Sequence, residues 1–247
     1  MSDRILTDAT TYGRHWADIY ESFVGALDPS AAVSFLSAVA GAGPVLELGI
    51  GSGRVGLPLR ATGVDVHGID ASEDMVALLR AKPDGHRVPV TIGDYANLEL
   101  PHQYTLIYGV YNAVLLLTTR AGQVSCFQHV ARHLRDDGRF VIEAEIPDFA
   151  GFVANGRFRV AGMSDDHVEL RVTSHRPSEQ LLISQHIWIS SHGIQLRPGA
   201  LRYATPSELD LMATNAGLEL ESRFGGWQRQ PFGDRSGAHV SVYRAAR

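Results

Sequence analysis

The chain has 247 residues, enough for one large core with an elaboration and too few for two average domains. Hydrophobic residues make up 45% and charged residues 20%, as in a soluble globular protein, and no apolar run is long enough to span a bilayer. The formal net charge is −5, Lys82 is the one lysine, and the arginines are scattered, which argues against nucleic acid as a partner. The single cysteine, Cys126, excludes an intrachain disulfide and a multi-cysteine zinc site.

The N-terminal stretch MSDRILTDATTYGRHW is charged and aromatic, whereas a signal peptide needs a continuous apolar segment. We therefore expect a cytoplasmic protein. Residues 1–43 are predicted to be largely helical. If the stretch is one helix, Tyr12, Trp16 and Tyr20 share a face, because each lies about one turn after the last.

From Pro44 onward, short apolar runs alternate with stretches of helical periodicity, which predicts a parallel sheet with crossover helices. The expected strands are 45–48, 64–69, 88–92, 104–110 and 139–146. The expected helices are 54–62, 72–82 and 119–135, with Ser72 and Asp74 as a plausible helix start. A doubly wound α/β fold follows.

After Pro147 the pattern changes to alternation at period two, from about 157 to 191, which predicts an antiparallel insert. One predicted strand has Val168, Leu170 and Val172 on one face, and His167, Glu169, Arg171, Thr173 and His175 on the other. In the stretch 181–190, His186 and Trp188 likewise lie on the more polar face. These polar faces either cover a site or face water.

A helix is predicted to begin near Pro206, followed by two strands at 218–226 and 239–244. The expected organisation is therefore an N-terminal segment at 1–43, an α/β domain made of 44–146 and 205–247, and an antiparallel β insert at 147–204.

A glycine-rich turn joins the first predicted strand to a helix, and such a turn lets a ligand lie against the backbone at a helix N-terminus. The sequence VLELGIGSGRVG fits two motifs. Counted from Gly49, with Glu47 on the strand, it is E-x-G-x-G-x-G; counted from Gly51, it is the dinucleotide fingerprint G-x-G-x-x-G. Asp70, at the end of the second strand, is compatible with both motifs.

Three later features favour the first motif. An acidic residue, Asp94, ends the third strand, and the stretch HLRDDGRFVIEAE contains the end of the predicted helix 119–135, a turn and the fifth strand. The closing helix, strand, glycine-rich turn and strand resemble the reversed sixth and seventh strands of class I methyltransferases. Together with the glycine loop, these features resemble the class I S-adenosylmethionine-dependent methyltransferases, whose sheet is Rossmann-like and seven-stranded. Asp136-Asp137-Gly138 stands where that family usually has Pro-Gly-Gly, a departure at a structural turn.

The resemblance implies S-adenosylmethionine as cofactor and S-adenosylhomocysteine as product, with no metal. Glu47 and the glycine loop would lie beneath the methionine part of the cofactor. Asp70 would bind the ribose hydroxyls and Asp94 the adenine amino group, although Asp94 could instead serve only as a turn or helix cap. The cofactor-binding residues so expected are Tyr12, Glu47, Gly49, Gly51, Gly53, Asp70, Ala71, Met75, Asp94 and Tyr95.

The antiparallel insert and the aromatic N-terminal segment resemble small-molecule members of the family, such as glycine N-methyltransferase and deoxyaminosugar N,N-dimethyltransferases. By this resemblance, residues 1–43 form a lid in which Tyr12 closes over the cofactor, with core packing as the alternative for Tyr12. The insert would cover the substrate site. The acceptor would be an amine or hydroxyl of a small molecule in secondary metabolism.

Acceptor-binding residues are expected where the fourth strand ends, since α/β folds bind ligands at that edge. Tyr111 and Asn112 are candidates for contact with the acceptor and for catalysis, with turn formation as the alternative for Asn112. His186 is a candidate base, and His175 and Trp188 are candidate acceptor-binding residues, if the polar face of the insert covers the site.

Other interpretations stay open at this stage. A nicotinamide-dependent oxidoreductase would use the dinucleotide motif, a protein or peptide methyltransferase would need an open groove, and a non-enzymatic sensor would lack an acceptor pocket. His129 and His133 lie one helical turn apart, but without a third ligand they are expected to be solvated helix positions. A homodimer is compatible with the sequence, which does not decide the oligomeric state.

Overall fold

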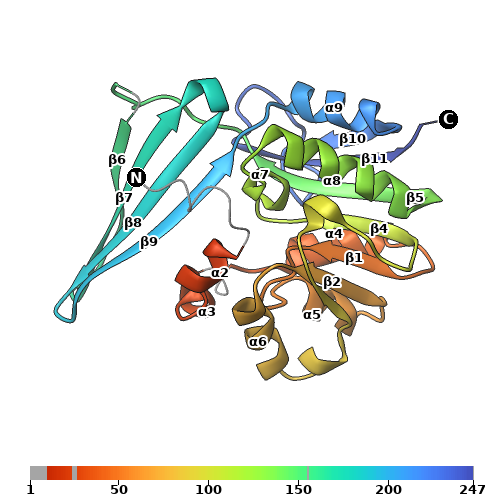
Figure 1. Cartoon of the computed structure of the whole chain (residues 1–247), viewed down its shortest axis with the longest axis horizontal. Coiled ribbons are helices and arrows are strands. Elements are labelled where there is room, and N and C mark those ends of the chain that lie inside the picture. The colour runs from red at the N-terminus through yellow and green to blue at the C-terminus, as the bar shows by residue number, and fades with distance from the viewer. Residues whose placement is uncertain (1–9, 24–26, 155, 247) are drawn as a thin grey trace.

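The computed structural model describes residues 10–23, 27–154 and 156–246, which form a large sheet flanked by helices and a smaller separate sheet (Figure 1). In spatial order, the strands of the large sheet are β10 (Leu218–Phe224), β11 (Ala238–Ala245), β5 (Leu134–Glu145), β4 (Tyr104–Gly109), β1 (Val45–Leu48), β2 (Val66–Asp70) and β3 (Val90–Ile92). Strand β11 runs antiparallel to β10 and to β5, and the other neighbouring strands of this sheet are parallel. The last two strands stand in reversed order, with β10 at the edge and β11 next to β5, which agrees with the resemblance of the closing elements to the reversed sixth and seventh strands.

Helices cover both faces of this sheet, which confirms the doubly wound fold. The helices of this domain are α4 (Ser30–Val39), α5 (Gly56–Ala61), α6 (Glu73–Ala81), α7 (Ala113–Leu116), α8 (Arg120–His133) and α9 (Pro206–Asn215), with single turns η1 (Gly85–Arg87) and η2 (Tyr95–Asn97). Alternation along β1 supplies both cores: Leu46 and Leu48 pack in a cluster with α8 and α9, and Val45 packs in a cluster with α4 and α5. None of the described helices is both long and apolar enough to cross a membrane.

The boundary between α8 and β5 differs from the expected one. The helix ends at His133 and the strand begins at Leu134, so the predicted turn at 136–138 lies within β5. The pairing of β5 with β4 shifts register between Tyr104 and Leu106, which is how the extra residues are accommodated in the ladder.

The insert is a four-stranded antiparallel sheet at one side of the molecule (Figure 1). Its strands, in order, are β6 (Gly156–Met163), β7 (His167–Arg176), β8 (Leu181–Ser190) and β9 (Gly193–Arg202), with the turn η3 (Pro177–Glu179) between β7 and β8. The alternating pattern predicted the strands between 157 and 191. It did not predict β9, whose Pro198 and glycines are tolerated because β9 is an edge strand.

Over much of the insert, the polar face is buried and the apolar face is exposed, although Leu181 and Ile183 at the start of β8 are buried on the apolar face. On the polar face, Glu169 and His186 are each only 6% exposed. On the apolar face, Phe158 is 62% exposed and Ile194 is 68% exposed. The polar face is therefore the inner face, turned toward the rest of the protein, which decides between the two orientations that the sequence left open.

Two short N-terminal helices, α2 (Thr11–Trp16) and α3 (Tyr20–Phe23), lie between the insert and the α/β domain (Figure 1). The Trp16 indole N–H donates to the Pro198 carbonyl at 3.0 Å, and Arg197 forms a bidentate ion pair with Asp18 at 2.6 and 2.9 Å. On the opposite side, the Lys82 ammonium of the segment after α6 lies 2.8 Å from the Glu21 carboxylate. These contacts fasten the N-terminal helices to both sheets.

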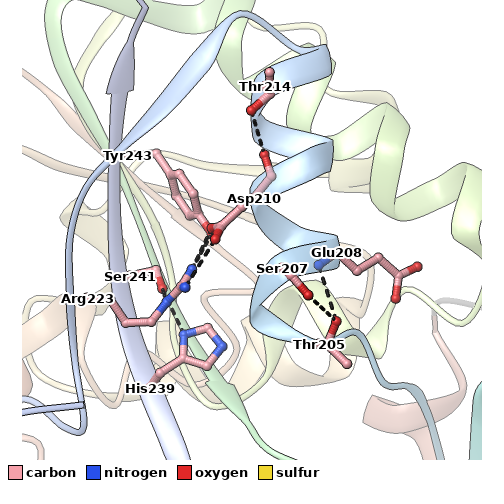
Figure 2. A network of polar contacts seen from close by, with 9 residues as sticks. All are labelled: Thr205, Ser207, Glu208, Asp210, Thr214, Arg223, His239, Ser241 and Tyr243. Atoms are coloured by element: carbon pink, nitrogen blue, oxygen red, sulfur yellow. Dashed lines mark hydrogen bonds and ion pairs between the residues drawn. The ribbon is translucent and has the colours of Figure 1, made fainter. Parts of the chain in front are cut away.

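A polar network fastens α9 to the last two strands (Figure 2). Arg223 of β10 forms two hydrogen bonds with Asp210 of α9, at 2.5 and 3.1 Å, and the Tyr243 hydroxyl donates to the same carboxylate at 2.9 Å. Next to this network, Ser241 contacts Arg223 and the His239 ring, each at 2.8 Å. The closing helix is thus held on the sheet by charge-assisted hydrogen bonds in addition to apolar packing.

Candidate active site

A cavity of about 280 Å³ opens at the carboxyl ends of β1, β2 and β4. Its walls come from the glycine loop after β1, from η2, and from the segment between β4 and α8. Gly13 and Tyr20 of the N-terminal helices and residues 198–200 of β9 line it as well. The cavity is therefore enclosed by three parts of the chain that are far apart in sequence.

Nine of the residues expected from the sequence line this cavity, namely Glu47, Gly49, Gly51, Asp70, Ala71, Met75, Asp94, Tyr95 and Tyr111. Gly53, Asn112, His175, His186 and Trp188 are not part of its described lining. Tyr12 lies in α2, but its side chain is outside the described part of the chain.

The glycine loop needs glycine because of its backbone geometry. Gly51 and Gly53 have φ values of +53° and +77°, in the left-handed region that residues with a side chain rarely adopt. A Cβ atom at Gly53 would lie 2.9 Å from the Leu57 side chain, and one at Gly51 would lie 3.2 Å from Met75 Cε. The loop thus brings bare backbone to the cavity wall.

Glu47 carries a carboxyl group that is 1% exposed. The Tyr108 hydroxyl donates to its Oε2 at 3.1 Å. Burial is the largest influence on this group and raises the Glu47 pKa to about 8, against the lowering effects of Tyr108 and Arg54. A positive charge brought into the cavity would reverse this shift, so the site favours a cationic ligand.

Asp70 is fixed by the loop that it faces. Its Oδ2 accepts from the Gly51 N–H at 2.7 Å, and its Oδ1 accepts from the Ser72 N–H at 2.8 Å. Burial raises the Asp70 pKa, and these two N–H groups oppose that change. Since each carboxylate oxygen can accept more than one hydrogen bond, Asp70 keeps capacity for hydroxyl donors.

Asp94 begins η2, and its Oδ1 accepts from the Ala96 N–H at 2.8 Å. The alternative role as a turn cap is therefore present, but it occupies only one oxygen of the carboxylate. The neighbouring Tyr95 donates its hydroxyl to the Ala113 carbonyl at 2.8 Å, which holds its ring against the cavity. A Cβ atom at Gly49 would lie 3.6 Å from that ring.

The segment after β4 contains two successive residues in the left-handed region, Tyr111 with φ +52° and Asn112 with φ +66°. Such strain persists only where surrounding contacts impose it. Here the Tyr111 N–H donates to Glu143 at 2.7 Å, and Asn112 Oδ1 accepts from the Glu145 N–H at 2.7 Å. Asn112 thus ties the turn to β5, while Tyr111 lines the cavity.

The three side chains expected on the polar face of the insert have local partners. His186 lies 3.1 Å from Glu169, and its ring is 4.8 Å from the Trp16 ring in an edge-to-face arrangement. Burial lowers the His186 pKa. His175 contacts the Tyr203 hydroxyl at 3.0 Å. Trp188 stacks on His167, with ring centres 5.6 Å apart.

Sequence reasoning missed Tyr20 and Arg54 as cavity residues. Burial raises the Tyr20 pKa to about 12, so its hydroxyl is protonated at neutral pH, and the Arg54 guanidinium lies 5.7 Å from the centre of the Tyr111 ring. Tyr20 carried a signal in its spacing from Trp16. Arg54 carried no such signal, because an arginine just before a helix is common and does not indicate a binding site.

Comparisons with known proteins agree with this geometry. The family described as "Methyltransferase domain" matches residues 45–138. The solved structure of the CcbJ methyltransferase from Streptomyces caelestis is 38% identical, with a TM-score of 0.91, and the match covers 97% of this chain and 100% of that one.

Two further relatives are more distant. The cypemycin N-terminal methyltransferase of a Streptomyces species is 24% identical over 94% of this chain and 96% of its own length. CalS10, an amino pentose methyltransferase from Micromonospora echinaspora solved with its cofactor bound, is 21% identical with a TM-score of 0.68, covering 92% of this chain and 97% of that one. The CcbJ methyltransferase is 38% identical to this chain over nearly its whole length, and the family match includes the glycine loop. The chain therefore belongs to the class I S-adenosylmethionine-dependent methyltransferases.

Proposed function

We propose that the protein transfers a methyl group from S-adenosylmethionine to an amine of a small molecule in secondary metabolism. The observation that carries the small-molecule part is the enclosure of the cavity by Gly13 and Tyr20 on one side and residues 198–200 on the other. A protein substrate would need an open groove there. The two distant relatives described above act, by their names, on an N-terminus and on an amino pentose, which supports an amine over a hydroxyl.

The residues around the cavity fit the cofactor. The bare backbone at Gly51 leaves room that a Cβ atom would take, and the buried Glu47 favours a cation. We assign the methionine part to Glu47 and the glycine loop, the ribose hydroxyls to Asp70 and the adenine amino group to the second oxygen of Asp94. Met75 and Tyr95 would supply apolar and aromatic surface, with Tyr12 closing over the cofactor, as inferred from the family resemblance.

When bound, the cofactor supplies a methyl group on a cationic sulfur, which an amine attacks in line. The protein's part is then mainly to hold the amine at the right place and to exclude water. Tyr111 is suited to this role, because its strained backbone is fixed by Glu143 and its side chain lines the cavity. No side chain has to act as a base if the amine has already lost its proton to water.

Domain roles follow from the same assignment. Residues 44–146 and 205–247 bind the cofactor, and residues 147–204 cover the acceptor. Within the expected lid 1–43, α2 and α3 take this role, whereas α4 packs in the core of the α/β domain. A homodimer stays a prediction, which sedimentation velocity would test.

A matched acceptor panel tests the proposal. The protein is incubated with cofactor carrying a labelled methyl group and with amino sugars, amino acids, their hydroxyl counterparts and short peptides, and products are read by mass spectrometry. We expect label on a small amine. Label on peptides alone would favour the peptide alternative, which the cypemycin relative makes specific. Label on hydroxyl counterparts alone would overturn the amine assignment.

A further inference from the structure

A row of four basic side chains crosses the inner face of the insert. Arg159 of β6 pairs with Arg171 of β7, Arg171 pairs with His186 of β8, and His186 pairs with Arg197 of β9. Cross-strand partners have neighbouring side chains on the same face, and like charges in such positions repel one another. We call these four residues the basic row. Arg159 is exposed, whereas Arg171 is half-buried and His186 and Arg197 are buried, so the charges of these three residues require compensation.

Two members of the row have acidic partners within the protein. Arg197 is paired with Asp18 through two hydrogen bonds and also donates to the His15 carbonyl. His186 is paired with Glu169 at 3.1 Å. Their positions are therefore explained by the fastening of the N-terminal helices and by the insert itself.

Arg171 is different. Its Nε is buried and has no hydrogen-bond partner among the described residues, and none of the ion pairs within 4.0 Å in that part of the chain includes it. Burial is the main cause that lowers its pKa, followed by the charge of Arg159. The charges of Glu169, Tyr111 and Glu145 raise the Arg171 pKa and so oppose this change. A guanidinium stays charged under these conditions, so Arg171 is a half-buried cation without a close carboxylate.

The position of Arg171 relates it to the cavity. Its charge and that of Arg54 both oppose the rise that burial causes in the Tyr111 pKa. Tyr111 lines the cavity, and Arg54 lies over its ring. Geometry places Arg171 beside the cavity as well, although it is not itself part of the described lining. Its cross-strand neighbour His186 packs against Trp16, and Trp16 donates to the carbonyl of Pro198, which lines the cavity.

We propose that Arg171, supported by Arg159, binds a carboxylate of the acceptor, so that the substrate is an amine that also carries a carboxylate. This inference rests on the proposed function. A guanidinium fork matches a planar carboxylate, and the bond replaces the partner that Arg171 lacks. A doubly charged phosphate fits less well, because the negative charges of Glu169 and Glu145, which influence the same guanidinium, would repel it.

A titration of the protein saturated with S-adenosylhomocysteine tests the proposal. The probes are acetate and benzoate, with acetamide and benzamide as neutral counterparts of the same shape. The variants are Arg171→Gln, Arg171→Lys and, as control, Arg176→Gln, which removes a positive charge from the same strand at the surface pair with Glu179. We expect the wild type to bind a carboxylate better than its amide, and Arg171→Gln to weaken carboxylate binding by at least about tenfold. Arg171→Lys should show a smaller loss, and Arg176→Gln should match the wild type.

The inference is overturned if neither carboxylate binds the wild type better than its amide, or if Arg171→Gln binds carboxylates like the wild type. If S-adenosylhomocysteine itself does not bind, the proposed cofactor site fails instead, and the two failures are thus distinguishable. Should Arg171→Gln not fold, phenylglyoxal modification of the wild type, read by peptide mass spectrometry, gives the answer. Benzoate but not benzamide should protect Arg171, with Arg176 modified equally in both, and equal modification of Arg171 would reject the site.

Discussion

The carboxyl group of Glu47 links binding to stability at the scale of a single residue. Its pKa in the folded protein is about 8, whereas an unfolded chain has a glutamate pKa of 4.5. A raised folded pKa means that the contribution of this group to stability is fully present below pH 4.5 and is lost as pH rises toward 8. At pH 7 the loss amounts to about 3 kcal/mol of the free energy of unfolding. The protein tolerates this cost at a position where a cation is expected to bind.

Glu47→Gln should therefore separate stability from binding. The glutamine keeps the shape and carries no charge to desolvate, so we expect the cofactor-free variant to unfold at the same or a higher temperature than the wild type at pH 7. The affinity for S-adenosylmethionine should fall by about tenfold or more, because the cation loses a carboxylate. Thermal unfolding and calorimetry measure the two effects. A lower melting temperature with unchanged affinity would mean that Glu47 is purely structural.

Single residues also show where sequence reasoning stops. Asp94 was expected either to bind the cofactor or to cap a turn. In the structure, its Oδ1 caps η2, and its second carboxylate oxygen is the one that we assign to the cofactor. Asn112 was expected to touch the acceptor or form a turn, and its side chain binds the backbone of Glu145. For Asn112, only the contact with β5, which is distant in sequence, shows where the side chain binds. For Asp94, the local cap leaves the role in cofactor binding a prediction.

At the scale of elements, the N-terminal helices and β9 form one closing unit. Trp16 and Asp18 contact β9 across a separation of about 180 residues in the chain. Arg197 is buried, and its ion pair with Asp18 is the contact that a single substitution can remove. The sequence could not predict this unit, because β9 has no clear alternation and because its partner lies at the other end of the chain.

Asp18→Asn should loosen the closing unit. The substitution leaves Arg197 buried without its carboxylate, which costs more than the loss of a surface pair. We expect S-adenosylhomocysteine to dissociate about two- to tenfold faster, measured by stopped-flow fluorescence, with little change in the association rate. Asp234→Asn, at an exposed loop position, is the matched control. Equal dissociation rates in wild type and Asp18→Asn would show that the ion pair does not hold the lid.

At the scale of the whole molecule, the α/β domain could be predicted from the sequence and the relation of the insert to it could not. Apolar runs between 45 and 146 alternate with helical stretches, and this pattern depends only on local burial. In the insert, period two identifies two faces but not which one is buried. Contacts of His186 with Trp16 and of Arg197 with Asp18 bury the polar face, so the usual rule of apolar burial gives the wrong orientation there.

The stability of the whole molecule should also report on His239. Burial lowers its pKa to about 4 in the folded protein, below its ordinary value of 6.5. The unfolded chain therefore takes up a proton first as pH falls, and stability is lost between about pH 6.5 and pH 4, by about 3 kcal/mol in total.

His239→Gln should remove this loss, although Glu47 acts in the opposite direction over part of the range. The difference between wild type and variant isolates the histidine. Between pH 7 and pH 5, the free energy of unfolding measured by chemical denaturation should therefore change more favourably in the variant than in the wild type, by about 2 kcal/mol. Parallel changes in both proteins would mean that His239 does not titrate as its burial requires.

The central claim, that the enclosed cavity is the cofactor site, is tested most directly by calorimetric titration with S-adenosylhomocysteine. Wild type and Cys126→Ala should bind it with equal affinity, since Cys126 is buried in the core away from the cavity. Asp70→Asn should bind at least about tenfold more weakly, because the ribose hydroxyls lose a charged acceptor while the shape of the side chain is kept. Unchanged affinity in Asp70→Asn, or no binding to the wild type at high micromolar concentration, would contradict the account.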